Sequence, residues 1–161
     1  IDCEVLEHES RVMYDGQIHD VEGVAKSVKL VKERLEKKLG IKFERAAVAA
    51  AGRALFTVKA KAEKKTSPFV EITEADIRDL ETDALSNAIK TLHEQNREAS
   101  FHNYYCVGFS PIKWYLQDEA LDNLVGQKGS SISVEIVATF LPRTVVESLL
   151  TVLNRRSEER V

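Results

Sequence analysis

The chain contains few of the features that mark secreted or membrane-spanning proteins. Its 161 residues include only two cysteines, Cys3 and Cys106, which lie far apart and are accompanied by no Cys-x-x-Cys pair and no secretory signal. This pattern favours free thiols in a reducing compartment over a disulfide framework. No apolar run approaches the roughly 20 residues that cross a bilayer. We therefore expect a cytoplasmic globular protein that makes no membrane contact through these residues.

Neither positive nor negative charge is in large excess. The net charge is −3, and Lys and Arg are mixed with Asp and Glu along the chain instead of forming a basic stripe. Nucleic-acid binding requires such a stripe, so we expect no nucleic-acid partner. The four histidines show no ligand spacing and no serine lies in a Gly-x-Ser-x-Gly elbow, so we predict no metal site, no cofactor and no catalytic residue.

The first segment reads as half of a layered α/β unit. Apolar residues recur at helical spacing over about 20–39, and Gly40 follows at the position of a left-handed C-cap. The short, nearly uncharged run at about 44–51 then predicts a covered strand. We assign residues 1–53 to this first domain.

A second domain is predicted over residues 54–157. From Ala54 apolar and charged residues alternate, which is typical of a strand with one face exposed to solvent. Thr73 and Asp76 have the spacing of a capping box, which predicts the start of a long helix. The remaining expected elements are a strand at Tyr104–Phe109, a break at Ser110-Pro111, a strand at Ile112–Gln117, a loop at Asp118–Asn123, a strand at Ser131–Phe140 and a closing helix from Pro142.

These elements predict an α+β fold in which a small mixed sheet carries two packed helices. The order within the second domain is strand, helix, strand, strand, strand, helix. The closing helix has one apolar side, which we expect to cover the sheet.

The loop that contains Gly126 and Gly129 is open to two interpretations. A Gly-x-x-Gly loop between two helices is the phosphate-contacting element of RNA-binding KH domains. The residues after Gly129 instead alternate with a period of two and are rich in β-branched side chains, which indicates a strand. We therefore expect the two glycines to form a structural turn, with KH-like RNA binding as the alternative function.

Four motifs in order carry a family resemblance. They are Ser10–Gly16 with Asp20, Val48–Gly52, Ile72–Ile77 and Asn123–Gly129. This order resembles the FtsA family of bacterial cell-division proteins, which are actin-like ATPases with an inserted strand-helix-strand-strand module. The resemblance implies that residues 1–53 are an incomplete actin-like, ribonuclease-H-like lobe and that residues 54–157 are the inserted module.

The same resemblance implies a function in assembly. In that family the inserted module contacts neighbouring subunits and other division proteins, which predicts protein partners and possible homo-oligomers. ATP and magnesium are bound there by Asp-x-Gly-Thr loops, which residues 1–161 lack, so we assign them only to a longer, full-length parent. Other actin-like branches, of the pilus-assembly, ethanolamine-utilisation or Hsp70-like type, are alternatives.

A contact site is predicted on the two consecutive aromatic strands. Because successive strand residues point to opposite faces, some of these aromatic residues must face outward. We expect an exposed edge or contact patch formed by Tyr105, Lys113, Tyr115 and Gln117.

Overall fold

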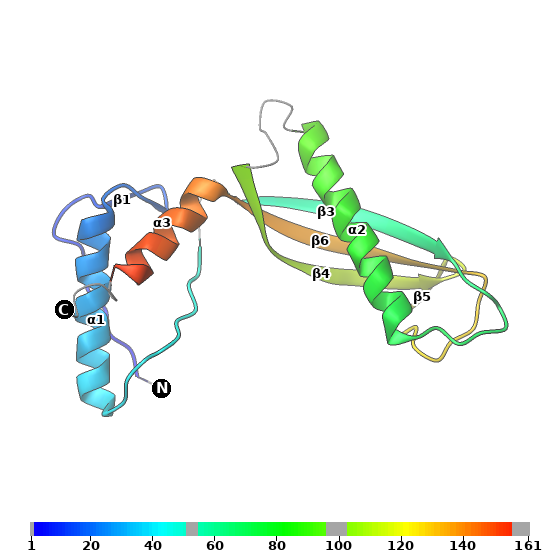
Figure 1. Ribbon diagram of the computed structural model, residues 1–161, viewed down its shortest axis with the longest axis horizontal. Coiled ribbons are helices and arrows are strands. Elements are labelled where there is room, and N and C mark those ends of the chain that lie inside the picture. Colours follow the sequence, from blue (N-terminus) through cyan, green and yellow to red (C-terminus); the bar gives the residue numbers. More distant parts are fainter. Residues whose placement is uncertain (1, 51–54, 96–102, 156–161) are drawn as a thin grey trace. The chain divides into compact units, whose positions relative to one another are not determined.

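The protein has an α+β fold with two compact units. The computed structural model describes residues 2–50, 55–95 and 103–155 (Figure 1). Residues 1–55 and 142–161 form unit 1, and residues 56–141 form unit 2. The elements are β1 (Met13–Tyr14), β2 (Gln17–Ile18), α1 (Val21–Leu39), β3 (Phe56–Lys65), α2 (Glu74–Gln95), β4 (Tyr104–Leu116), β5 (Glu119–Leu121), β6 (Ser131–Pro142) and α3 (Arg143–Asn154).

Unit 2 is a four-stranded sheet in the order β3-β6-β4-β5. β6 pairs antiparallel with β3 over ten residues, from Phe56↔Phe140 to Lys65↔Ser131. The Gln117 amide, just beyond β4, donates to the Ser131 carbonyl at the start of β6, so β4 also runs antiparallel to β6. The sheet is therefore antiparallel throughout, and the prediction of a mixed sheet was wrong.

The α2 helix covers one face of this sheet (Figure 1). Its apolar stripe consists of Leu80, Ala84, Ala88 and Leu92, all of them buried. The two alanines let the helix axis approach the strands closely, and burying Leu80 completely contributes about 2 kcal/mol. On the sheet, buried residues alternate with exposed or half-buried ones along β3 and between Val134 and Phe140 of β6, as a strand with one covered face requires.

The start of α2 is fixed by the predicted capping box. The Thr73 amide donates to the Asp76 carboxylate at 3.0 Å, and the Asp76 amide donates to the Thr73 hydroxyl at 3.3 Å. Lys64 of β3 adds an ion pair with Asp76 at 3.3 Å. The backbone and hydroxyl bonds from Thr73, followed by the bond from Lys64, lower the pKa of Asp76.

Unit 1 is built around α1, whose predicted span is confirmed. The Asp20 carboxylate accepts from the amides of Glu22 and Gly23, and Gly40 closes the helix at φ 68°. Ahead of the helix, Asp15 and Gly16 form the turn of a short hairpin between β1 and β2. The buried core of the unit is small and consists of Val12, Val24 and Val152.

The predicted strand at about 44–51 is absent from the part that the structure describes. Residues 41–50 are irregular and mostly exposed, and residue 51 lies outside the described residues. A strand needs a neighbour to take up its backbone hydrogen bonds. The strand pair of unit 1, β1 with β2, does not extend to this run.

Three further predictions about unit 2 need correction. The expected break at Ser110-Pro111 does not occur, because β4 continues through it, and the expected loop after β4 contains the short strand β5. The closing helix α3 does not cover the sheet of unit 2 as predicted. It packs on α1 through Val152, and the compact unit that contains the sheet ends at residue 141.

Candidate protein-docking edge

Most of β4 lies at an edge of the sheet. Its inner neighbour is β6, and on its outer side β5 pairs only with Trp114, Tyr115 and Leu116. Residues 104–113 therefore have no outer strand partner among the residues that the structure describes. Unpaired strand edges present backbone N–H and C=O groups that can pair with another strand.

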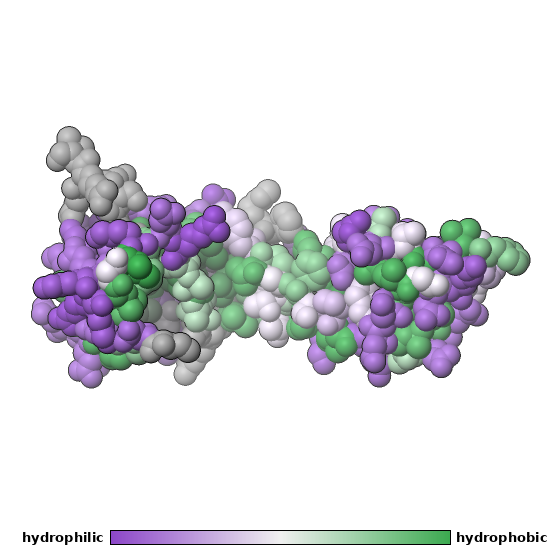
Figure 2. Space-filling model, turned by 90° about the horizontal axis from the view of Figure 1, so that it is seen from below, coloured by the Kyte–Doolittle hydropathy of each residue, from purple (hydrophilic) through white to green (hydrophobic). Residues whose placement is uncertain are grey.

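This edge carries no charge over nine residues. Residues 104–112 read Tyr-Tyr-Cys-Val-Gly-Phe-Ser-Pro-Ile, and the first charged side chain is Lys113. Three apolar side chains in this run are strongly exposed, namely Val107 at 49%, Phe109 at 41% and Ile112 at 50%. Hydrophobic and weakly polar residues, green to white, lie over this part of unit 2 in Figure 2.

The neighbouring Tyr104 determines which face the exposed residues occupy. Its ring packs edge to face on Phe56 and belongs to the core under α2. Because alternate residues of a strand point to opposite faces, Tyr105, Val107 and Phe109 point away from α2. We call these three residues the β4 strip.

The opposite edge of the sheet is chemically different. Along β3 the exposed positions are occupied by Thr57, Lys59, Lys61, Glu63 and Lys65. Charged side chains, lysine above all, are how natural sheets discourage edge pairing. Of the two edges, only that of β4 is left unprotected over several residues.

The polar side chains of Tyr115, Glu135 and Lys61 interact with one another beside the β4 strip. The Tyr115 hydroxyl donates to the Glu135 carboxylate at 3.3 Å, and the Lys61 ammonium lies 5.1 Å from the centroid of the Tyr115 ring. Desolvation, followed by the Glu135 charge and hydrogen bond, raises the pKa of Tyr115. Next to this group is a shallow hollow of about 310 Å³, lined by Lys59, Ala60, Lys61, Ile112 and Glu135.

The four predicted contact residues do not form one patch. Tyr105 and Lys113 are exposed as predicted, whereas Tyr115 is half-buried and engaged with its own sheet. Gln117 lies in the turn after β4 at φ 48°. Tyr105 and Tyr115 are ten strand residues apart, a distance of roughly 33 Å at 3.3 Å per residue.

The prediction missed the residues that make the edge distinctive. Val107, Phe109 and Ile112 were not included, although the lack of charge between Tyr104 and Ile112 is visible in the sequence. Treating Ser110-Pro111 as a break concealed a single long strand. Proline is tolerated in an edge strand, which is the position that β4 occupies.

The Gly126 to Gly129 loop is a structural turn that leads into a strand. Gly126 adopts φ 82°, and its amide donates to the Ile72 carbonyl at 2.9 Å. A Cβ at Gly129 would lie 2.5 Å from the Leu116 side chain, so only glycine fits there without movement. The helix that a KH-type phosphate site requires after this loop is replaced by β6.

Neither a metal-binding cluster nor a membrane-spanning helix occurs within residues 2–50, 55–95 and 103–155. In these ranges no cluster of three or more His, Cys, Asp or Glu side chains could hold a metal ion. No helix within them combines the length and the hydropathy needed to cross a membrane. Cys3 and Cys106 are both exposed and unpaired, as predicted.

Comparison with models of known protein families finds no match, and no curated protein has a significantly similar sequence.

Proposed function

We propose that this chain is a non-enzymatic docking module that binds a partner protein through the β4 edge. The observation that carries the proposal is a ten-residue stretch, 104–113, which has no outer strand among the described residues and no charge before Lys113. An extended segment of a partner adds a strand to such an edge, where main-chain hydrogen bonds supply affinity and side-chain contacts supply specificity.

The β4 strip favours a partner segment with apolar residues at alternate positions. A strand paired with β4 would place every second side chain beside Tyr105, Val107 and Phe109, on the same face of the sheet. Because these side chains are already about half exposed, they need little rearrangement to be covered.

The sequence resemblance supports a narrower proposal about the parent protein. The four motifs and the order strand, helix, strand favour an actin-like cell-division ATPase of the FtsA type, with the docking module as its contact surface for other division proteins or neighbouring copies. On this proposal ATP, magnesium and any association with the inner face of the membrane belong to the full-length parent, and the protein is cytoplasmic. An extended reading frame with Asp-x-Gly-Thr loops would support this part, and a frame without them would count against it.

The docking edge is tested by selecting extended peptides from a random display library on the purified chain. Selection is repeated on Val107→Lys, which puts a charge in the strip, and on Val5→Lys, which makes the same change at an exposed valine of unit 1. We expect peptides with alternating apolar residues that bind the native chain and Val5→Lys but lose affinity for Val107→Lys by tenfold or more, about 1.4 kcal/mol. Peptides that bind Val107→Lys as tightly as the native chain would refute the docking edge.

A titration with labelled single-stranded RNA at low salt separates this proposal from the KH-like alternative. We expect no binding, because Lys128 and its neighbours form no basic groove and no helix follows Gly129. Affinity that collapses as salt increases would favour the RNA-binding function.

A further inference from the structure

The open part of the β4 edge ends where β5 begins to pair. β5 covers the outer side of Trp114, Tyr115 and Leu116, so Lys113 is the residue of β4 at which the open edge starts. Strand pairing uses the backbone N–H and C=O groups on this outer side, and β5 already occupies them beyond Lys113. A partner strand is therefore confined to residues 104–113 as long as β5 stays in place.

The turn between β4 and β5 fixes the position of β5 along the edge. It consists of two residues, Gln117 and Asp118, with φ of 48° and 69°. Positive φ at both central residues is typical of a type I′ turn, whose twist matches that of the strands it joins. Because turn type and loop length set the register of a hairpin, Leu121 is held opposite Trp114.

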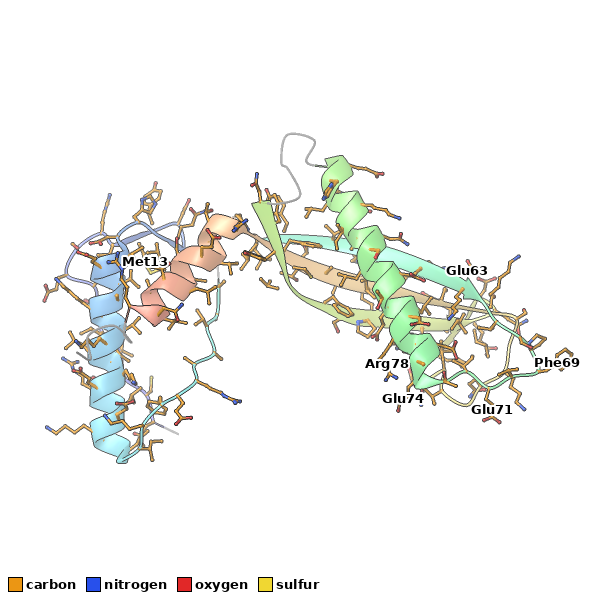
Figure 3. All side chains as sticks on the ribbon, viewed as in Figure 1. Met13, Glu63, Phe69, Glu71, Glu74 and Arg78 are labelled. Carbon is orange, nitrogen blue, oxygen red and sulfur yellow. The ribbon has the colours of Figure 1, made fainter. Side chains whose placement is uncertain are left out.

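The chain that follows β5 is anchored away from the edge. Leu121 packs on the core under α2, and Leu124, in the next turn of the chain, is only 1% exposed. The Gly126 amide donates to the Ile72 carbonyl at 2.9 Å. Ile72 follows Glu71, which Figure 3 labels at the end of the sheet where these two loops meet. These contacts keep β5 from sliding along β4.

Carboxylates lie at the point where the chain leaves the edge. Glu119 in β5 and Asp122 just after it are both exposed, whereas residues 104–112 carry no charge. The end of a partner segment that meets β5 therefore meets negative charge. A C-terminal end, which presents carbonyl or carboxylate oxygens, is repelled there, and an N-terminal end, which presents N–H groups, is attracted.

The sheet itself favours the same direction for a partner strand. β3 with β6, β6 with β4, and β4 with β5 all run antiparallel. Antiparallel pairs are slightly more stable per residue than parallel ones. A segment antiparallel to β4 continues in the direction of β5, which places its N-terminal end beside Lys113 and its C-terminal end beside Tyr105.

We infer that the ligand of the docking edge is an extended segment of about ten residues that pairs antiparallel with β4 and has its N-terminal end against β5. The inference rests on the proposed docking edge and specifies the length and direction of the segment that this edge accepts. Any partner residues that precede the segment must turn away from the sheet at Lys113, because β5 occupies the edge beyond it.

Paramagnetic labels on a bound peptide test the direction. The probe is a ten-residue peptide selected on the native chain, with a nitroxide at either its N-terminal or its C-terminal end. We expect the N-terminal label to broaden the amide signals of Lys113 and Ala120, and the C-terminal label to broaden those of Tyr105 and Val107. Ten strand residues separate the two ends by roughly 33 Å, which makes the two patterns distinct.

Peptide length tests the limit that β5 sets. Three residues added to the N-terminal end of the probe should change its Kd by less than twofold, because β5 covers residues 114–116. In Asp118→Pro the turn is lost, since proline cannot adopt a φ of 69°, and the longer peptide should bind severalfold more tightly than the shorter one. The double change Gln117→Asn with Asp118→Gly keeps a type I′ turn and should behave like the native chain.

Two outcomes would overturn the inference. The reverse pattern of broadening would mean a parallel strand, and a severalfold gain from the longer peptide on the native chain would mean that the partner displaces β5. Both would leave the docking edge standing as long as binding depends on Val107, whereas binding that Val107→Lys does not weaken refutes the edge itself. Circular dichroism confirms that Asp118→Pro is folded, and the two measurements on the native chain decide the matter if it is not.

Discussion

Tyr104 packs edge to face on Phe56 with ring centroids 5.4 Å apart, whereas the next residue, Tyr105, points to the opposite face of the sheet. The two adjacent tyrosines should therefore respond differently to truncation. We expect Tyr104→Ala to lower the free energy of unfolding of unit 2 by about 2 kcal/mol, because it removes an aromatic ring from the core. Tyr105→Ala should change it by less than about 0.5 kcal/mol. Urea unfolding followed by Trp114 fluorescence measures both, and equal losses would contradict the assigned faces.

Glu36 should make unit 1 sensitive to acid. This residue of α1 is only 6% exposed; its carboxylate accepts from the Lys42 ammonium and the Phe43 amide, both at 2.9 Å. These bonds, the one from Lys42 foremost, lower the pKa of Glu36 from 4.5 to about 2. Because the folded pKa lies below the unfolded one, the stabilisation is complete above pH 4.5 and is lost as pH falls through about 2.

We accordingly expect Glu36→Gln to lower the thermal midpoint of unit 1 at neutral pH, by an amount that shrinks between pH 4.5 and about 2. The exposed Glu33 on the same helix supplies the control, since Glu33→Gln should leave the midpoint nearly unchanged. A Glu36→Gln effect of constant size across this pH range would show that the carboxylate acts through packing instead of charge.

Local patterns predicted much of the secondary structure. The helix ending at Gly40, the capping box of Thr73 and Asp76, and the strand after Gly129 are all confirmed, because each depends on residues within a few positions of one another. Long-range relationships were not predictable in this way. The partner of α3, the lack of a strand at 44–50 and the continuity of β4 depend on which elements meet in space.

The candidate site was only partly predictable, because it too depends on which elements meet in space. The sequence indicated outward aromatic residues, and Tyr105 is one of them. It could not show that β5 pairs with only three residues of β4, which is what leaves the edge open. Nor could it show that backbone hydrogen bonds join the loop before α2 to the loop before β6.

Two glycines of unit 2 should differ in their tolerance of a methyl group. A Cβ at Gly129 would lie 2.5 Å from Leu116 and 3.0 Å from Gln117, whereas a Cβ at Gly108 would meet no atom within 4 Å. We expect Gly129→Ala to cost about 1 to 3 kcal/mol through overpacking. Gly108→Ala should be neutral or stabilise by up to about 1 kcal/mol, because it restricts the unfolded chain. Chemical denaturation of both variants checks this, and a tolerated Gly129→Ala would show that the turn after β5 can shift.

The two cysteines provide a direct probe of the docking edge, because one lies in it and the other does not. Cys106 is an exposed thiol of β4, between Tyr105 and Val107, and Cys3 is an exposed thiol of unit 1. When a selected peptide pairs with the β4 edge, the added strand lies beside Cys106, so the alkylation rate of Cys106 should fall severalfold while that of Cys3 stays constant. In Val107→Lys, which weakens peptide binding, the protection of Cys106 should disappear. Mass spectrometry of the alkylated peptides gives both rates in one sample, and parallel changes at Cys3 and Cys106 would point to general aggregation instead of docking at β4.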